Sequence, residues 1–296
     1  MIPSVPSSRS LDIYGHRGAR GLFPENTIEG FRAALALGVT AFELDVGLTA
    51  DGVAVLAHDL ALNPAVTRDA QGRWLPGAGP LIWSMPFAGL VEYDVGRLCP
   101  GTAYDALFPA QQPVDGARIP ALSAALALAG IERFVIELKT DPRFPADTAS
   151  PEAMADVVLR AIDAAGVAER SILESFDWRG PRHIRRQRPD IAMAWLTRAE
   201  TIRDAHIWWG GPHPSDFGGS VPRAVAAEGG GIWAPAFADL TQDLVAEAHD
   251  LGLSVVPWTV NEPADMRRVI GWGVDGLITD RPDLGMTIRA GNAVMG

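Results

Sequence analysis

The sequence predicts an α/β fold, a TIM (β/α)8 barrel with a small inserted cap segment after the second strand. Short apolar runs typical of buried strands alternate with helical patterns through most of the 296 residues. Eight such strand–helix units in a chain of this length favour a TIM barrel over a doubly wound sheet. Polar residues able to do chemistry follow several predicted strands, which is where such barrels carry their active sites.

The first two strands are predicted from apolar runs at residues 11–14 and 41–46. Between them Thr27 is a typical helix N-cap, and apolar residues recur at helical spacing until Gly38 ends the helix. The two runs therefore form a strand–helix–strand unit, as the start of a parallel barrel requires.

The third apolar run, residues 53–57, follows the second strand too closely to lie parallel to it. A parallel crossover needs about a dozen residues, and fewer lie between the two runs. We therefore expect an antiparallel hairpin that turns at residues 50–52. Such a hairpin would bring His58 roughly opposite Glu43 of the second strand.

Residues 60–118 lack strand or helix periodicity over most of their length. Pro, Gly and aromatic residues are frequent there, and a short helix is expected near residues 86–93. The aromatic side chains can pack together, so we expect an ordered segment. We interpret it as a cap inserted into a single barrel domain that spans residues 1–296.

After the cap, strand and helix patterns alternate again. The predicted strands are residues 134–138, 171–175, 192–196, 231–235, 254–258 and 276–278. The predicted helices are residues 122–128, 151–165, 178–187, 222–227, 240–251 and 264–272. A polar, glycine-rich stretch between residues 197 and 230 interrupts this alternation.

The composition excludes several classes of function. A net charge of -11 argues against a nucleic-acid-binding surface. The single cysteine, Cys99, excludes an internal disulfide and a thiolate zinc cluster. The first ten residues lack the apolar region of a signal peptide, and no apolar run is long enough to span a bilayer. We therefore expect a cytoplasmic protein without stable membrane insertion; the sequence sets no oligomeric state.

Acidic and basic residues gather at the predicted strand ends. Glu43 and Asp45 share one strand face, as do Glu137 and Lys139. Lys139 is the only lysine among 25 basic residues, and a compact ammonium group suits contact with phosphate. Together with the histidines that follow two strands, these residue types suit metal-assisted chemistry on a phosphate.

The chain resembles the glycerophosphodiester phosphodiesterase family, within the PI-PLC-like phosphodiesterase superfamily. The resemblance extends from about residue 14 to residue 283, and its motifs occur in the family's order. The motifs are His16-Arg17-Gly18, Pro24-Glu25-Asn26-Thr27, Glu43-Leu44-Asp45, Asp51-Gly52, His58-Asp59, Glu137-Leu138-Lys139, Ser175-Phe176, Trp258-Thr259-Val260-Asn261 and the segment 275–283. The cap and the stretch 197–230 depart from the family pattern, so the resemblance is weakest for the identity of the substrate.

The resemblance implies metal-dependent hydrolysis of a small-molecule glycerophosphodiester to sn-glycerol 3-phosphate and an alcohol. It implies that His16 and His58 are the general acid and base, in either order. The nucleophile is either water or the substrate's own 2-hydroxyl group. Arg17 and Lys139 match the family's phosphate-contacting positions.

The resemblance also implies a metal site and a substrate-binding wall. Glu43, Asp45 and Glu137 match the family's ligands of one divalent cation. Carboxylate oxygens suit the hard cations Mg²⁺ and Ca²⁺, and the sequence leaves the choice between them open. Phe176 and Trp258 either contact the glycerol or fill the barrel mouth.

Other polar residues near the strand ends are interpreted as structural. Asn261 is expected to tie down a loop, and Asp280 to hold the turn after the last strand. Glu25 and Asn26 either belong to the start of the first helix or support the metal site. Four histidines without a motif are expected to be structural or at the surface: His183, His206, His213 and His249.

Two other functions compete with this interpretation. A lysophospholipase D-like enzyme would hydrolyse acylated glycerophosphodiesters and would need an apolar groove, which the Trp and Phe residues of the cap could supply. A non-catalytic sugar- or phosphate-binding barrel would show a broken set of acids or histidines, and the set in this sequence is complete.

Overall fold

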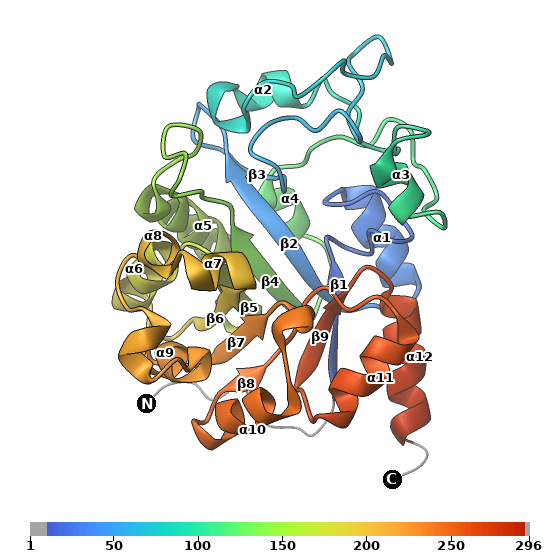
Figure 1. Cartoon of the computed structure of the whole chain (residues 1–296). Helices are drawn as coiled ribbons and strands as arrows, with labels where there is room; N and C mark the ends of the chain where they lie inside the picture. Colours follow the sequence, from blue (N-terminus) through green and yellow to red (C-terminus); the bar gives the residue numbers. More distant parts are fainter. Residues whose placement is uncertain (1–10, 294–296) are drawn as a thin grey trace.

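Eight parallel strands form the barrel wall in the computed structural model, which describes residues 11–293 (Figure 1). Their order is β8-β7-β6-β5-β4-β2-β1-β9. They are β1 (Asp12–His16), β2 (Ala41–Leu48), β4 (Arg133–Leu138), β5 (Ser171–Ser175), β6 (Ala192–Thr197), β7 (Ile232–Pro235), β8 (Ser254–Val255) and β9 (Gly276–Thr279). Backbone hydrogen bonds close the wall: the Asp275 amide donates to the Val255 carbonyl at 2.9 Å, and the Ile278 amide donates to the Pro257 carbonyl at 3.0 Å. The predicted TIM barrel is confirmed.

The short strand β3 (Ala54–Leu56) returns antiparallel along β2, as predicted. The register pairs Val46 with Leu56. Beyond this ladder, the Ala57 amide donates to the Asp45 carbonyl at 3.1 Å. The chain after β3 therefore enters the barrel mouth beside the acidic end of β2.

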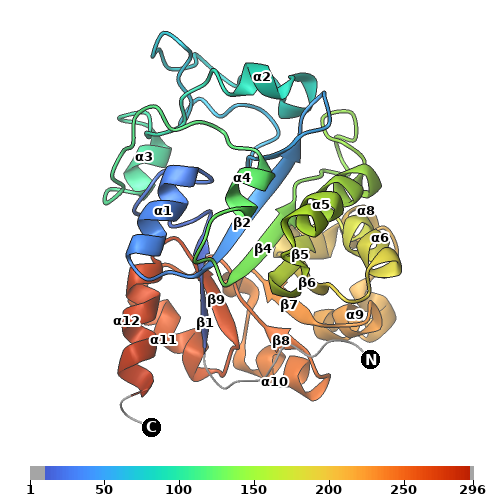
Figure 2. The same ribbon diagram turned by 180° about the vertical axis from the view of Figure 1, so that it is seen from behind.

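Helices cover the outside of the wall, and Figure 2 shows α1, α4 and α5 beside β2 and β4. They are α1 (Ile28–Ala36), α4 (Leu122–Leu126), α5 (Pro151–Ala165), α6 (Arg179–Gln187), α7 (Ala199–Arg203), α8 (Ala205–Trp208), α9 (Val221–Ala227), α10 (Gln242–Asp250), α11 (Pro263–Gly271) and α12 (Pro282–Ala293). The predicted cap of α1 is confirmed, since the Thr27 hydroxyl accepts a hydrogen bond from the Gly30 amide. Helices α7, α8 and α12 lie outside the predicted helices.

Strand β8 is shorter than the predicted run 254–258. Only its first two residues pair in the ladder with β7. Pro257 has no amide hydrogen and cannot extend a ladder. The amides of Val256 and Trp258 still donate to β7 carbonyls, at 3.0 and 3.1 Å. The chain therefore continues along the wall up to the mouth, where Trp258 lies.

Side chains alternate between two buried layers along each strand. On β4, Phe134 and Ile136 pack in the cluster between the strands and the helices. Val135 packs with Ile172 of β5 in the barrel interior. The next inward position on β4 is Glu137, at the C-terminal end of the strand. A polar mouth thus lies directly above an apolar barrel core.

Residues 60–118 form the cap, at the top of Figure 1. Its helical turns are η1 (Ile82–Ser84), α2 (Phe87–Leu90) and α3 (Ala103–Leu107). A separate apolar cluster, which includes Leu62 and Leu90, packs against Val55 of β3. The cap therefore has little regular structure but its own packing, as expected.

No helix within residues 11–293 is long and apolar enough to cross a bilayer. The expectation that a signal peptide is missing concerns the first ten residues, which lie outside the described part of the chain.

Candidate active site

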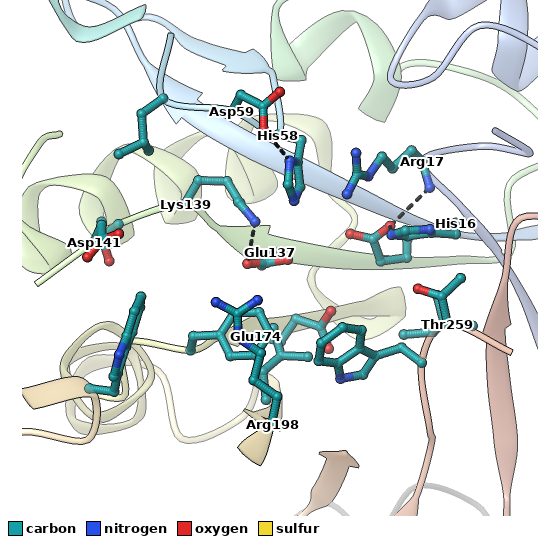
Figure 3. A pocket seen from close by; sticks show the side chains of 18 of the residues that line it. His16, Arg17, His58, Asp59, Glu137, Lys139, Asp141, Glu174, Arg198 and Thr259 are labelled. Carbon is teal, nitrogen blue, oxygen red and sulfur yellow. Dashed lines mark hydrogen bonds and ion pairs between the residues drawn. The ribbon is translucent and has the colours of Figure 1, made fainter. Parts of the chain in front are cut away.

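A cavity of about 450 Å³ opens at the mouth of the barrel (Figure 3). Eight of the nine predicted site residues line it: His16, Arg17, Glu43, His58, Glu137, Lys139, Phe176 and Trp258. The ninth, Asp45, is completely buried next to them. Six further charged residues line the cavity: Arg20, Asp59, Asp141, Arg143, Glu174 and Arg198. Charged side chains therefore supply ten of the twenty residues that line the cavity.

Strand register brings carboxylates from three neighbouring strands together. Asp45 of β2 pairs with Glu137 of β4, which pairs with Glu174 of β5. Glu43 lies one inward position earlier on β2 and pairs with His16 of β1. The short distances between parallel strands thus place four acids at one part of the mouth.

Glu43, Glu137 and Glu174 converge most closely. Each offers one carboxylate oxygen, and these oxygens all lie within 4.8 Å of one another. Burial raises the pKa of Glu43 and of Glu174 well above the usual range, and the neighbouring carboxylates raise it further. Burial also raises the pKa of Glu137, although the charge of Lys139 lowers it. Three buried carboxylates so close together repel one another when ionised, so bound protons or a bound cation would stabilise the cluster.

Asp45 belongs to the predicted metal set, but basic side chains of the protein hold it. Arg17 Nε lies 3.1 Å from its Oδ2, and Lys139 Nζ lies 3.4 Å from its Oδ1. The Asn26 side-chain amide donates to Oδ2 at 2.9 Å. Burial raises the pKa of Asp45, but Arg17 and Lys139 hold it well below the usual range. The three acids whose oxygens lie closest together are therefore Glu43, Glu137 and Glu174, whereas the predicted set contains Asp45 and lacks Glu174.

The donor set fits a hard divalent cation. Oε2 of Glu174 and Oδ1 of Asp45 are buried and have no hydrogen-bond partner among the described residues. Buried carboxylate oxygens are normally satisfied by a donor or by a metal ion. Oxygen ligands suit Mg²⁺ and Ca²⁺, so these acids could hold either ion.

His16 is buried and oriented by a carboxylate from the end of β9. Its Nδ1 lies 2.6 Å from Oδ1 of Asp280, which also accepts from Arg20 Nε at 3.0 Å. Burial raises the pKa of Asp280, but His16 and Arg20 hold it well below the usual range. His16 Nδ1 therefore donates to an ionised carboxylate, and Nε2 is left as a proton acceptor. Burial lowers the pKa of His16 to about 4, although Asp280 raises it.

His58 reaches the same cavity from the segment after β3, as the predicted hairpin requires. Its Nδ1 lies 2.7 Å from Oδ1 of Asp59. Burial raises the pKa of Asp59, but the hydrogen bond and charge of His58 lower it to about 2. In Figure 3, His58 and Lys139 lie on one side of Glu137, and Glu174 lies on its other side. Each catalytic candidate thus has its own carboxylate partner.

Arg17 connects the barrel mouth to the cap. Its φ of 52° is left-handed, and its amide donates to Oε2 of Glu43 at 3.0 Å. Its Nη1 donates to Glu25 at 2.8 Å, and the hydroxyl of Tyr104, on cap helix α3, donates to the same carboxylate at 2.5 Å. Arg20 Nη1 donates to the Tyr104 oxygen at 3.0 Å. Glu25 therefore helps to position the Arg17 side chain at the cavity.

Aromatic side chains form another part of the cavity wall. The ring centroids of Phe176 and Trp258 are 5.3 Å apart, and Phe176 also lies 6.3 Å from Trp208. The Arg198 guanidinium lies 5.2 Å from the centroid of the Phe176 ring. Figure 3 shows Arg198 pointing into the cavity. Both predicted aromatic residues are thus positioned to contact a ligand.

Some residues of the site were not predicted. Arg20, Tyr104 and Glu174 were missed, and Asp280 was assigned only to a turn. Glu174 carried a signal, because an acid inside the predicted strand 171–175 is unusual for a buried strand. The four histidines without a motif do not line this cavity, as expected.

Comparisons with known proteins identify the family of this chain. The protein-family model described as "Glycerophosphoryl diester phosphodiesterase family" matches residues 16–284 of this chain. A glycerophosphodiester phosphodiesterase from Caldanaerobacter subterraneus subsp. tengcongensis is 26% identical over 275 residues, which are 92% of this chain and 94% of that protein.

Two solved structures have the same fold. A candidate glycerophosphoryl diester phosphodiesterase from Silicibacter pomeroyi is 41% identical, with a TM-score of 0.88 over 98% of this chain and 95% of that one. An Oleispira antarctica phosphodiesterase in complex with the product sn-glycerol-3-phosphate is 19% identical, with a TM-score of 0.68 over 96% and 97% of the two chains. The second similarity concerns the fold alone.

Proposed function

Because the chain belongs to the glycerophosphoryl diester phosphodiesterase family, we propose that it hydrolyses a small-molecule glycerophosphodiester to sn-glycerol 3-phosphate and an alcohol. One observation carries the proposal: two histidines, the basic side chains of Arg17 and Lys139 and a group of buried carboxylates converge on one cavity. Phosphodiester hydrolysis needs these groups for proton transfer, phosphate binding and charge stabilisation. The Caldanaerobacter relative has the same activity in its name.

The two histidines would carry the proton transfers. His16 is assigned as the general base, because Asp280 holds its Nδ1 as a donor and leaves Nε2 to accept the proton of the nucleophile. His58 lies beside the ionised Asp59 and is assigned as the general acid. The nucleophile forms a bond to phosphorus, the phosphorus–oxygen bond to the alcohol breaks, and the proton of His58 passes to the leaving oxygen.

Basic side chains would hold the phosphate beside these histidines. Lys139 keeps its charge, because Glu137 at 2.8 Å and Asp45 at 3.4 Å raise its pKa although burial lowers it. Arg17 lies on the same side of the cavity as His16 (Figure 3). When Mg²⁺ or Ca²⁺ is bound by the predicted set, Glu43, Asp45 and Glu137, it supplies Lewis-acid polarisation of a phosphate oxygen.

The shape and lining of the cavity favour a small polar substrate. Charged side chains supply half of the twenty lining residues, whereas an acyl chain requires a continuous apolar groove. The apolar cavity beside His58, lined by cap residues such as Leu62 and Ile82, holds only about 50 Å³. A lysophospholipase D-like activity on acylated substrates is therefore the less favoured alternative.

The proposal is tested by the release of sn-glycerol 3-phosphate from glycerophosphocholine. The reaction is run with Mg²⁺, with Ca²⁺ and with a chelator, and in parallel with the acylated analogue of the same head group. We expect metal-dependent release from the unacylated diester and slower turnover of the acylated one. Release that persists in chelator would contradict the metal requirement, and faster turnover of the acylated analogue would favour the alternative.

A further inference from the structure

Glu174 is a buried acid for which the reaction described above gives no role. It lies on β5 and has a relative exposure of 2%. The β4–β5 register sets it beside Glu137, on the strand face that points into the barrel. Its carboxylate is thus directed to the cavity that holds the other acids.

Glu174 lacks the stabilising contacts that its two neighbours have. Glu43 accepts a hydrogen bond from the Arg17 amide at 3.0 Å, and Glu137 accepts one from Lys139 at 2.8 Å. Oε2 of Glu174 is buried without a hydrogen-bond partner in the described part of the chain. A buried carboxylate oxygen without a donor is unfavourable unless a proton or a cation compensates for the lost hydration.

The spacing of the three glutamates suits a shared cation. One oxygen from each of Glu43, Glu137 and Glu174 lies within 4.8 Å of the others. Ca²⁺ binds oxygen at about 2.3–2.6 Å, so two ligands on opposite sides of the ion are about 5 Å apart. Arg17 and Asn26 contact Oδ2 of Asp45, whereas its Oδ1, like Oε2 of Glu174, has no hydrogen-bond partner among the described residues.

We propose that Glu174 is a direct ligand of the divalent cation, which it binds together with Glu43 and Glu137. This inference deepens the proposed function and rests on it for the role of the cation in the reaction. The ligand set then differs from the set implied by the motifs, because it includes Glu174. Metal affinity of this chain should depend on an acid that lies outside the motifs.

The test measures metal binding without substrate. Isothermal titration of metal-free protein with Ca²⁺, and separately with Mg²⁺, is compared for the wild type, Glu174→Gln and the control Asp177→Asn. Asp177 is a buried acid at the exit of the same strand, but it pairs with Arg179 and lies outside the cluster. We expect Glu174→Gln to raise the dissociation constant about tenfold or more and to lose most of the metal-induced rise in Tm. Asp177→Asn should keep the wild-type affinity.

Each outcome decides the inference. Equal metal affinity in Glu174→Gln and the wild type would overturn it, because Glu174 would then be a neutral, protonated acid that glutamine can replace. Absence of binding of either cation to the wild type would also overturn it. If Glu174→Gln does not fold, Glu174→Asp, which keeps the charge on a shorter side chain, is used in its place and should also weaken binding. Failure of the proposed function has a different signature: Glu174-dependent metal binding without hydrolysis of any glycerophosphodiester.

Discussion

His16 Nδ1 lies 2.6 Å from Oδ1 of Asp280, although the two residues are 264 positions apart in the chain. The contact forms because β1 and β9 are neighbours in the barrel wall, so both strands end at the same point. Arg20 and Asn261 bind Asp280 from two other directions. The imidazole is therefore held through Nδ1, and its Nε2 lies 3.7 Å from Oε2 of Glu43.

Asp280→Asn should lower kcat by about 10²-fold or more, since positioned acid–base groups contribute about 10²–10⁴-fold. The amide can present its NH₂ group to Nδ1 and so favour the wrong tautomer of His16. The measurement is steady-state kinetics on glycerophosphocholine, with circular dichroism to verify the fold.

The matched control for Asp280→Asn is Asp283→Asn. Asp283, in the first turn of α12, pairs with Arg281 at 2.7 Å and does not line the cavity. It should retain near wild-type kcat. Equal losses in the two variants would show that the effect is not specific to the orientation of His16.

Tyr104→Phe should lower kcat/KM about tenfold, because a hydrogen bond to a charged group is worth about 1.5–3 kcal/mol. Burial and Glu25 raise the pKa of Tyr104, so its hydroxyl stays protonated and donates to Glu25. Its loss would loosen Arg17 and Arg20 together. The control is Tyr93→Phe, also in the cap, where the side chain packs in the apolar cluster. A loss of the same size in both variants would indicate a general effect on the cap.

In chelator, the Tm of the metal-free protein should fall as pH rises above about 6.5, the ordinary pKa of histidine. The folded-state pKa values of Glu43 and Glu174 are raised, so their contribution to stability is fully present below the usual glutamate pKa. That contribution is lost as pH rises through the folded-state values. His16 does not contribute in this window, because its lowered pKa costs stability only at lower pH.

The check on this pH dependence is thermal unfolding of the wild type and of Glu174→Gln, with and without Ca²⁺. The variant should show a smaller fall in Tm, because one of the raised carboxyl groups is gone. Added Ca²⁺ should raise the wild-type Tm more at the higher pH, since metal binding displaces protons. Two results would contradict the raised pKa values of Glu43 and Glu174. One is a Tm that rises with pH in chelator, and the other is the same dependence of Tm on pH in the wild type and in Glu174→Gln.

Much of the barrel and its central site could be predicted from local patterns. Alternation along β2 placed Glu43 and Asp45 on one face, and the shortness of the next connection indicated the hairpin that delivers His58. These features depend on strand periodicity and chain length, which are visible in a single sequence.

The remainder depends on tertiary placement. The convergence of Glu174 on Glu137 requires the β4–β5 register, and the contact of Tyr104 with Glu25 requires the path of the cap. Arg17, which pairs with Asp45 at 3.1 Å, has a left-handed backbone that the sequence pattern does not indicate. Periodicity gives no information on these contacts between distant segments.

The central claim is most directly tested by the release of sn-glycerol 3-phosphate from glycerophosphocholine by His16→Ala and His58→Ala. The control is His206→Ala, an exposed residue of α8 outside the cavity. With saturating divalent cation, both variants should lose about 10²–10⁴-fold in kcat, while the control keeps wild-type turnover. Near wild-type turnover in either variant, with the fold intact, would contradict acid–base catalysis by this pair of histidines.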